Sequence, residues 1–278
     1  MQNYLEQLKQ KNYSSGTIKV YRYIFRQFEN LGFGKIAIKK FQEKIVNLSP
    51  VTRQSYLICL RKILKEFKPE LCKMIIIPKV PKVLPKNIPN QEEMKRILQL
   101  PDTLTFQGIR DKTILELLYS SGLRRKEVTN LLVEDIDSAK HIIRITQGKM
   151  RKDRLIPISS RAVQWIRKYS EYVRPNLKPK SNHLFLSSRG TQISVNTVYL
   201  ITKKYSKYST HSFRHAFSTH LLQNGMKETS LQSLLGHSQI TTTQRYTQVT
   251  GQELKETYRK YHGRDKWALR LRSVTEDQ

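Results

Sequence analysis

Four prolines lie between Pro78 and Pro89 and alternate with lysines in the segment IIIPKVPKVLPKNIP. Proline fixes its own φ, lacks a backbone N–H and disfavours a helical conformation at the residue before it, so this segment cannot form a regular helix. An extended, semi-rigid connector is the conformation that such a composition favours. We therefore predict a linker over residues 77–90, one domain before it (residues 1–76) and a second after it (residues 91–263).

The part before the linker has the apolar periodicity of helices. In SSGTIKVYRYIFRQFENLG, Ser14 or Ser15 can cap a helix and Gly32 can end it. In LSPVTRQSYLICLRKILKEFKP, Ser49 can cap a helix that has Pro50 in its first turn. The apolar positions that we assign to the core are Ile18, Tyr21, Ile24, Phe25 and Phe28 in the first segment and Val51, Tyr56, Ile58, Leu60, Ile63, Leu64 and Phe67 in the second.

The part after the linker mixes helix and strand. RDKTILELLYSSGLRRKEVTNL predicts a helix that ends near Gly122, a turn, and a second helix that carries Glu127. HIIRITQGKMRKDRLIPI predicts a β-hairpin with strands at residues 142–146 and 155–158 and a strongly basic loop between them. Residues 161–261 read as helices joined by short turns. The fold class that we expect is mainly α with a small β-sheet.

The charge of the chain is extreme. It has 51 Lys and Arg against 22 Asp and Glu, a formal net charge of +29. Both parts share this excess, since residues 1–90 hold 18 basic and 5 acidic residues. Such a balance indicates a polyanionic partner, with nucleic acid as the first choice. On charge alone, a solvated basic surface or a ribosomal-type structural role stays open.

The cysteines and the N-terminus indicate a compartment. Cys59 and Cys72 lie in apolar sequence without metal-like spacing, which favours buried free thiols in a reducing environment. The first residues, MQNYLEQLKQ, lack the apolar core of a signal peptide, and no apolar run approaches the length of a membrane span. We expect a cytoplasmic protein that does not contact a membrane.

The segment STHSFRHAFSTHLLQNG gathers three histidines and one arginine. His211 and His215 stand at i and i+4, as on a zinc-binding helix, but that motif needs a glutamate where this chain has Ser212. Arg214 would also repel a dication, so we predict no metal site. His211 and Arg214, at i and i+3, share a helix face that suits an oxyanion, above all a phosphate.

Further along, SLLGHSQITTTQRYTQV places His237 after a glycine and Tyr246 nine residues later. The segments SGLRRKEV, QGKMRKDR, HSFRHAFSTHLL and LLGHSQITTTQRYTQV resemble, in the same order, the four motif boxes of the tyrosine recombinases, the integrase and Xer-type family. LKETYRKYHGR resembles the C-terminal helix by which members dock on a neighbouring subunit. The resemblance covers nearly the whole chain.

This resemblance implies a helical core-binding (SAM-like) domain at residues 1–76 and an α+β catalytic domain at residues 91–263, with a tail at 264–278 of no assigned role. It implies that Tyr246 attacks a DNA phosphate, forms a 3′-phosphotyrosyl bond and frees a 5′-hydroxyl. A phenol with a pKa of about 10 needs a proton acceptor nearby. The implied enzyme is a site-specific DNA recombinase.

The resemblance also assigns the other site residues. Arg124 and Arg214 would clamp the non-bridging oxygens, the kind of stabilisation that usually contributes most. The remaining roles are proton donation to the leaving oxygen by Lys149, acid and base catalysis by His211, a phosphate hydrogen bond from His237 and orientation of Arg124 by Glu127. His215 and His220 are expected to pack between helices or to support the residues that touch the phosphate, rather than to act as catalysts. Lys152 stays an alternative to Lys149, because Met150 stands where the family's loop usually has a second glycine.

The implied partners are double-stranded DNA and further copies of the chain, linked in a cyclic tetramer through the C-terminal helices. No metal or nucleotide cofactor is implied, and a paired or accessory recombinase stays open. The alternatives are a type IB-like topoisomerase, which would use a similar site without exchanging strands, and a DNA-binding protein that has lost catalysis. A metal-dependent nuclease is disfavoured because paired carboxylates are scarce.

Overall fold

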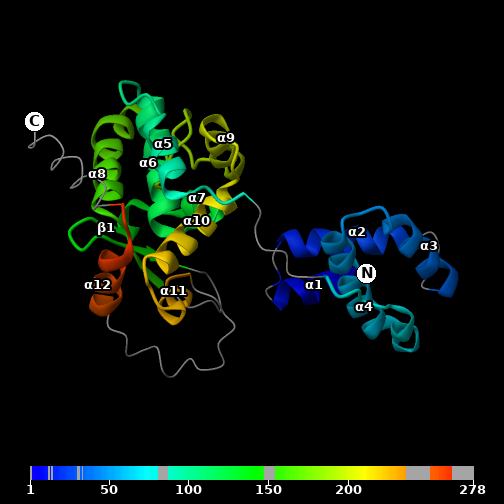
Figure 1. The fold of residues 1–278 in the computed structure, drawn as a ribbon. Coiled ribbons are helices and arrows are strands. Elements are labelled where there is room, and N and C mark those ends of the chain that lie inside the picture. The colour runs from blue at the N-terminus through cyan, green and yellow to red at the C-terminus, as the bar shows by residue number, and fades with distance from the viewer. Residues whose placement is uncertain are drawn as a thin grey trace, which may run out of the picture. The chain divides into compact units, whose positions relative to one another are not determined.

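The computed structural model describes residues 2–11, 13, 15–29, 32, 34–80, 87–146, 154–235 and 251–264. The chain forms two compact units, Met1–Leu84 and Pro85–Gln278 (Figure 1). Residues 75–80 and 87–90 have no helix or strand, in keeping with their prolines. Among the described residues, no helix is both long and apolar enough to cross a bilayer.

The N-terminal unit consists of helices around a core of aliphatic and aromatic side chains. Its elements are α1 (Gln2–Gln10), α2 (Ser15–Glu29), α3 (Lys35–Ile45), α4 (Pro50–Phe67) and the 3-10 helix η1 (Pro69–Met74). All five predicted core residues of α2 are buried. Ser49 caps α4 as expected, accepting a hydrogen bond from the Thr52 backbone N–H at 3.3 Å. Ser15 is the first residue of α2, and Ser14, the other predicted cap, lies outside the described residues.

The predicted core positions of α4 are correct in part. Leu60, Ile63 and Leu64 are fully buried, but Val51 is 61% exposed and Ile58 is 38% exposed. These two residues stand two turns apart on the face of the helix that looks away from the core, and one helix buries only one stripe. Phe67 at the end of α4 is 41% exposed, with its ring edge against Tyr4.

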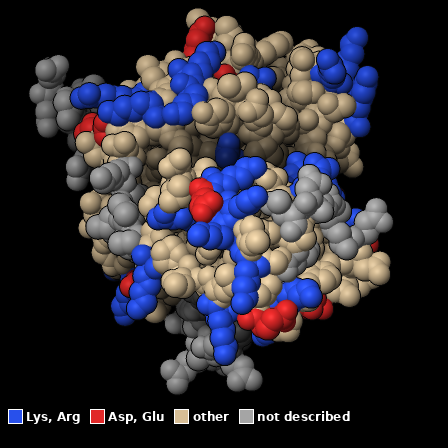
Figure 2. Space-filling model, turned by 90° about the vertical axis from the view of Figure 1, so that its right-hand side faces the viewer, with Lys and Arg blue, Asp and Glu red and all other residues tan. Residues whose placement is uncertain are grey.

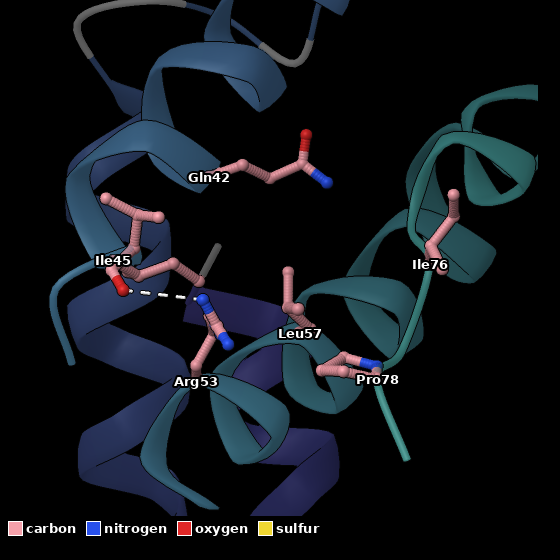
Figure 3. A pocket seen from close by; sticks show the side chains of 7 residues that line it. Gln42, Ile45, Arg53, Leu57, Ile76 and Pro78 are labelled. Atoms are coloured by element: carbon pink, nitrogen blue, oxygen red, sulfur yellow. Dashed lines mark hydrogen bonds between the residues drawn. The ribbon is translucent and has the colours of Figure 1, made fainter. Parts of the chain in front are cut away.

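A pocket of about 260 Å³ lies between α3, α4 and the residues after η1 (Figure 3). Its lining is mostly aliphatic and includes one ionisable side chain, Arg53, whose Nη1 donates to the Val46 carbonyl at 3.4 Å. The pocket therefore lacks the combination of acid, base and nucleophile that catalysis would need. Cys59 and Cys72 are free, as predicted, and are half-buried rather than buried.

The C-terminal unit combines helices with a three-stranded antiparallel sheet of order β1-β2-β3. Its elements are α5 (Gln91–Gln99), α6 (Phe106–Ser121), α7 (Arg125–Asn130), η2 (Val133–Asp135), β1 (Ile136–Asp137), β2 (Ile142–Ile145), β3 (Arg154–Pro157), α8 (Ser160–Lys168), η3 (Tyr169–Val173), η4 (Pro175–Leu177), α9 (Val195–Tyr205), α10 (Thr210–Gln223), α11 (Glu228–Leu235) and α12 (Gly251–Tyr261). The mainly α fold with a small sheet is confirmed. The predicted hairpin is β2 and β3, paired Ile143 to Ile156; β1 was not expected.

Helix α6 is the centre of this unit, with α8 and α10 packed against it (Figure 1). Twelve of its 16 residues are buried, among them the charged Asp111, Lys112 and Glu116. It ends at Gly122, as predicted, where φ is +60° and a glycine avoids the strain that a side chain would bring. Arg124, the first of the predicted site arginines, follows two residues after Gly122, so the end of α6 determines its position.

Helix α12 packs on its own unit, whereas the resemblance predicts docking on a neighbouring subunit. The Tyr258 hydroxyl donates to the Ser120 carbonyl at 2.7 Å, and the Tyr258 ring stacks on His262 at 4.6 Å. Arg264 forms two hydrogen bonds with the buried Glu116 carboxylate. Arg264 is the first residue of the predicted tail, so the start of that tail is part of the packed unit.

Candidate active site

Arg214 joins two segments that are far apart in the sequence. It lies in the second turn of α10, a helix that Ser209 caps by accepting from the Ser212 backbone N–H at 3.1 Å. Its Nη1 donates to the Gly122 carbonyl at 2.5 Å, and its Nη2 donates to the Leu235 carbonyl at 2.9 Å. The first contact fixes the turn before Arg124. The second fixes the end of α11, directly before the segment that contains His237 and Tyr246.

The environment of Arg214 is strongly positive. The residue is 7% exposed, and burial together with the nearby charge of Arg124 lowers its pKa to about 10. It stays charged at neutral pH, since that value is far above 7. A fixed guanidinium whose charge is poorly compensated favours the arrival of an anion.

Glu127 holds Arg124 by two contacts. Its Oε2 accepts from the Arg124 backbone N–H at 2.8 Å, and its Oε1 accepts from Arg124 Nη1 at 2.9 Å. The Arg124 side chain keeps 43% of its surface exposed, whereas that of Glu127 keeps 13%. Glu127 thus contacts both the backbone and the guanidinium of Arg124, and the exposed part of this side chain remains accessible to a ligand. That Glu127 orients Arg124 toward a phosphate stays a prediction.

Sequence reasoning missed a second partner of Glu127. Arg154, the first residue of β3, donates from Nη2 to Glu127 Oε1 at 3.0 Å, and its side chain is 10% exposed. A signal for it exists in the sequence. Side chains alternate along a strand, so Arg154 shares a face with Ile156, which is fully buried. A charged residue on the apolar face of a strand needs a buried partner.

The ionisation of Glu127 follows from these contacts. Burial by itself would raise the pKa of its carboxyl group. The backbone N–H of Arg124 and the charges of Arg154 and Arg124 outweigh that effect and hold the pKa below its usual value. Glu127 is therefore a carboxylate at neutral pH and orients arginine side chains without taking up a proton.

His211 and His215 lie side by side on the exposed face of α10, with ring centroids 6.1 Å apart. Partial burial, the neighbouring His215 and the arginines Arg214, Arg125 and Arg124 lower the pKa of His211. A neutral imidazole at neutral pH can accept a proton. His215 is exposed, so it does not pack inside the helix bundle, and support of the neighbouring site residues stays its predicted role. His220 is buried, and its Nδ1 lies 3.0 Å from the Tyr119 hydroxyl.

The described part of the site thus contains Arg124, Glu127, Arg154, His211 and Arg214. The remaining predicted residues, namely Lys149 with its alternative Lys152, His237 and Tyr246, lie outside the described residues. No group of three or more His, Cys, Asp or Glu that could hold a metal ion occurs among the residues that the structure describes.

One face of the molecule is strongly basic. On the face drawn in Figure 2, Lys and Arg form broad patches, and Asp and Glu form only small isolated ones. Such a surface attracts a polyanion over distances beyond direct contact. This face and the candidate site therefore favour the same kind of ligand.

The described part of the unit brings Arg124, Arg214 and His211 close enough for their charges to act on one another. The sequence pattern of the phage integrase family matches residues 89–253, more than half of the chain. The chain therefore belongs to this family, the tyrosine recombinases, whose members cut and rejoin DNA.

The relatives narrow this class to the Xer type. Tyrosine recombinase XerC of Pelotomaculum thermopropionicum is 40% identical over 202 residues, a match that covers 68% of this chain and 65% of that protein. Tyrosine recombinase XerA of Pyrococcus horikoshii is 34% identical over 274 residues, covering 94% of this chain and 92% of that protein.

Solved structures share the fold. The XerH site-specific recombinase bound to its difH substrate has a TM-score of 0.64 at 20% identity, covering 91% of this chain and 82% of that chain. A lambda integrase tetramer bound to a Holliday junction has a TM-score of 0.65 at 15% identity, covering 86% and 76%. The likeness at these identities concerns the fold.

Proposed function

We propose that this chain is a site-specific DNA recombinase that cuts and rejoins strands through a covalent bond between DNA and Tyr246. The observation that carries the proposal is the position of Arg214. One buried guanidinium holds the turn before Arg124 and the end of α11, and so links three of the four motif segments at one point.

The proposed reaction is a transesterification, in which the tyrosine oxygen replaces the 5′-oxygen on a DNA phosphate. The Tyr246 oxygen attacks phosphorus, the bond from phosphorus to the 5′-oxygen breaks, and a 3′-phosphotyrosyl ester forms. His211 accepts the phenol proton, and Lys149 donates a proton to the leaving 5′-oxygen. Arg124 and Arg214 stabilise the charge on the non-bridging oxygens, and His237 donates a hydrogen bond to the phosphate.

The reverse reaction follows from the same intermediate. The ester keeps the energy of the broken phosphodiester, so the 5′-hydroxyl of another strand can attack it and release Tyr246. Two guanidinium groups supply the positive charge that a metal supplies in other phosphoryl transfers. The scheme therefore calls for neither a metal nor a nucleotide.

The assembly that we propose is a cyclic tetramer on two double-stranded DNA sites. Two proteins with a similar fold support this assembly: XerH is bound to difH DNA, and lambda integrase is a tetramer bound to a Holliday junction. In the single chain, α12 covers buried groups of α6 through Tyr258 and Arg264. We propose that a neighbour's α12 occupies this surface in the complex, a heterologous contact that can close a ring.

One experiment tests the chemistry. The protein is incubated with EDTA and a nicked suicide substrate that carries its recombination site, and covalent adducts are resolved on a denaturing gel. Wild type is expected to form an adduct and Tyr246→Phe to form none. The absence of an adduct in wild type would refute both the recombinase and the topoisomerase, leaving a DNA-binding protein without catalysis.

A second measurement separates the recombinase from the topoisomerase. Joining of two differently labelled sites is expected for a recombinase, whereas relaxation of supercoiled DNA without joined products would favour the topoisomerase. Deleting residues 252–278 is expected to leave DNA binding intact and to weaken the pairing of sites. Because Tyr258 and Arg264 contact buried groups, the thermal unfolding of the truncated protein is measured alongside; full recombination by it would contradict the proposed assembly.

A further inference from the structure

One carboxylate in the C-terminal unit serves two arginines from different elements. Glu127 lies in α7, Arg124 directly precedes this helix, and Arg154 begins β3. Oxygen Oε1 accepts from both guanidinium groups, at 2.9 Å from Arg124 Nη1 and 3.0 Å from Arg154 Nη2. Glu127 therefore connects the hairpin to the residue that is proposed to meet the phosphate.

The two arginines differ in exposure. The Arg124 side chain is 43% exposed and that of Arg154 is 10% exposed. Within the described residues, the Nε and Nη1 atoms of Arg154 are buried and have no hydrogen-bond partner, so Glu127 is the one acceptor that this guanidinium has there. A buried cation with a single carboxylate partner depends on that partner being ionised and correctly placed.

The strand sets the direction in which the Arg154 side chain leaves the backbone. Its backbone pairs with Ile145 of β2, and it shares a strand face with the fully buried Ile156. The sheet thus directs the side chain inward, and the contact with Glu127 holds the guanidinium there. Of the three arginines whose charges act on one another here, Arg124, Arg154 and Arg214, the exposed one is Arg124.

We propose that Arg154 is a positioning residue for strand cleavage: it holds Glu127, and through Glu127 it holds the Arg124 guanidinium in the orientation that receives the scissile phosphate. Arg154 itself does not contact the DNA. This inference rests on the proposed function, since it assigns Arg124 to the phosphate. It adds a residue that the motif boxes leave without a role.

The test measures adduct formation on the suicide substrate at saturating DNA, for wild type, Arg154→Gln, Arg154→Lys, Glu127→Gln and the double variant Arg154→Gln/Glu127→Gln. Arg154→Gln is expected to slow adduct formation roughly 10- to 100-fold, because a displaced catalytic group costs that much in rate. The DNA dissociation constant stays as in wild type. Arg154→Lys, which keeps the positive charge, recovers part of the rate.

The double variant provides the decisive comparison. If Arg154 acts through Glu127, adding Arg154→Gln to Glu127→Gln slows the reaction no further, so the two effects are not additive. Additive effects, or a raised dissociation constant for DNA, would overturn the inference, because they would mean that Arg154 acts on the DNA directly. The double variant also removes both charges together, so it stays informative if Arg154→Gln alone fails to fold.

A matched control is Arg144→Gln in the neighbouring strand β2. The Arg144 side chain is 52% exposed, and its Nε lies 3.5 Å from Asp135 Oδ1. Because Arg144 has no contact with Glu127 in the described part of the chain, Arg144→Gln should leave the rate of adduct formation unchanged. If wild type forms no adduct, the proposed function fails. If wild type and Arg154→Gln form it at the same rate, only the role of Arg154 fails.

Discussion

Two clusters of the C-terminal unit each combine one carboxylate with two cations but differ in their surroundings. In the arginine cluster, Glu127 binds Arg124 and Arg154. In the C-terminal clamp, Glu116 of α6 binds Lys112 of the same helix at 3.3 Å and Arg264 beyond α12. Each cluster is one carboxylate shared by two cations, and each joins segments that are distant in sequence.

Exposure separates the two clusters. Every side chain of the clamp is buried, with 8%, 0% and 12% exposed for Lys112, Glu116 and Arg264. Burial is the main cause that lowers the pKa of Lys112, and the Glu116 charge opposes it. In the arginine cluster, Arg124 keeps 43% of its surface exposed. A carboxylate that pairs with two cations therefore stabilises the packing of the chain where little of any partner is exposed. Where one of the cations remains accessible, that cation can also bind a ligand.

The largest effect is expected from Glu116→Ala. It leaves Lys112 and Arg264 buried without their carboxylate, and breaking a buried pair in this way costs about 3–5 kcal/mol of stability. Thermal unfolding of the full chain measures it, with the exposed Glu134→Ala as control. Unfolding equal to wild type would mean that the clamp does not fasten α12.

The next largest effect is expected from Arg124→Ala, which tests whether the arginine cluster acts on a ligand. Adduct formation at saturating DNA should slow about 10²- to 10³-fold, as on removal of one oxyanion donor, while the unfolding temperature stays near that of wild type. A large loss of stability with little change in the rate of adduct formation would mean that the arginine cluster, like the C-terminal clamp, mainly stabilises the fold.

The pH dependence of cleavage should show the lowered pKa of His211. The imidazole accepts a proton only when neutral, and its pKa lies below the ordinary 6.5. The rate should therefore reach half of its maximum at a pH below 6.5 and drop about tenfold per pH unit below that point. His215→Gln removes a neighbouring charge and should move this midpoint to higher pH. A midpoint at or above pH 6.5 in wild type would contradict the assignment.

The smallest effect is expected from the surface pair of Lys140 and Asp137, whose atoms lie 3.1 Å apart with 72% and 39% of the side chains exposed. Lys140→Ala should leave the unfolding free energy close to that of wild type, since exposed pairs contribute little. Denaturant unfolding measures this change in free energy, which is then compared with the change that Glu116→Ala causes. A loss as large as that of Glu116→Ala would show that burial is not the deciding factor.

Much of the fold could be read from local sequence. The core of α2, the cap at Ser49, the end of α6 at Gly122 and the β2-β3 hairpin follow from periodicity and turn chemistry, which act within a few residues. The predicted burial of Val51 and Ile58 was wrong because an apolar residue in a helix does not say which face meets the core.

The candidate site could be predicted where its residues form motifs. Arg124, Glu127, His211 and Arg214 stand in recognisable segments, and the structure places Glu127 on Arg124. Arg154 ends one of these segments and Glu116 lies in none, but neither position indicates which residue the side chain binds. Their partners lie 27 and 148 residues away in the chain, a separation that no local spacing encodes.

The sequence by itself determined the family, the helical and strand segments, the basic charge and the residue types that meet a phosphate, because these depend on composition and near neighbours. Only the tertiary structure decided which carboxylate each buried cation binds, that α12 packs on its own unit, and that Arg124 rather than Arg154 stays accessible. The physical reason is that burial and ion pairing depend on which distant segments meet, and the packing of the whole unit sets that.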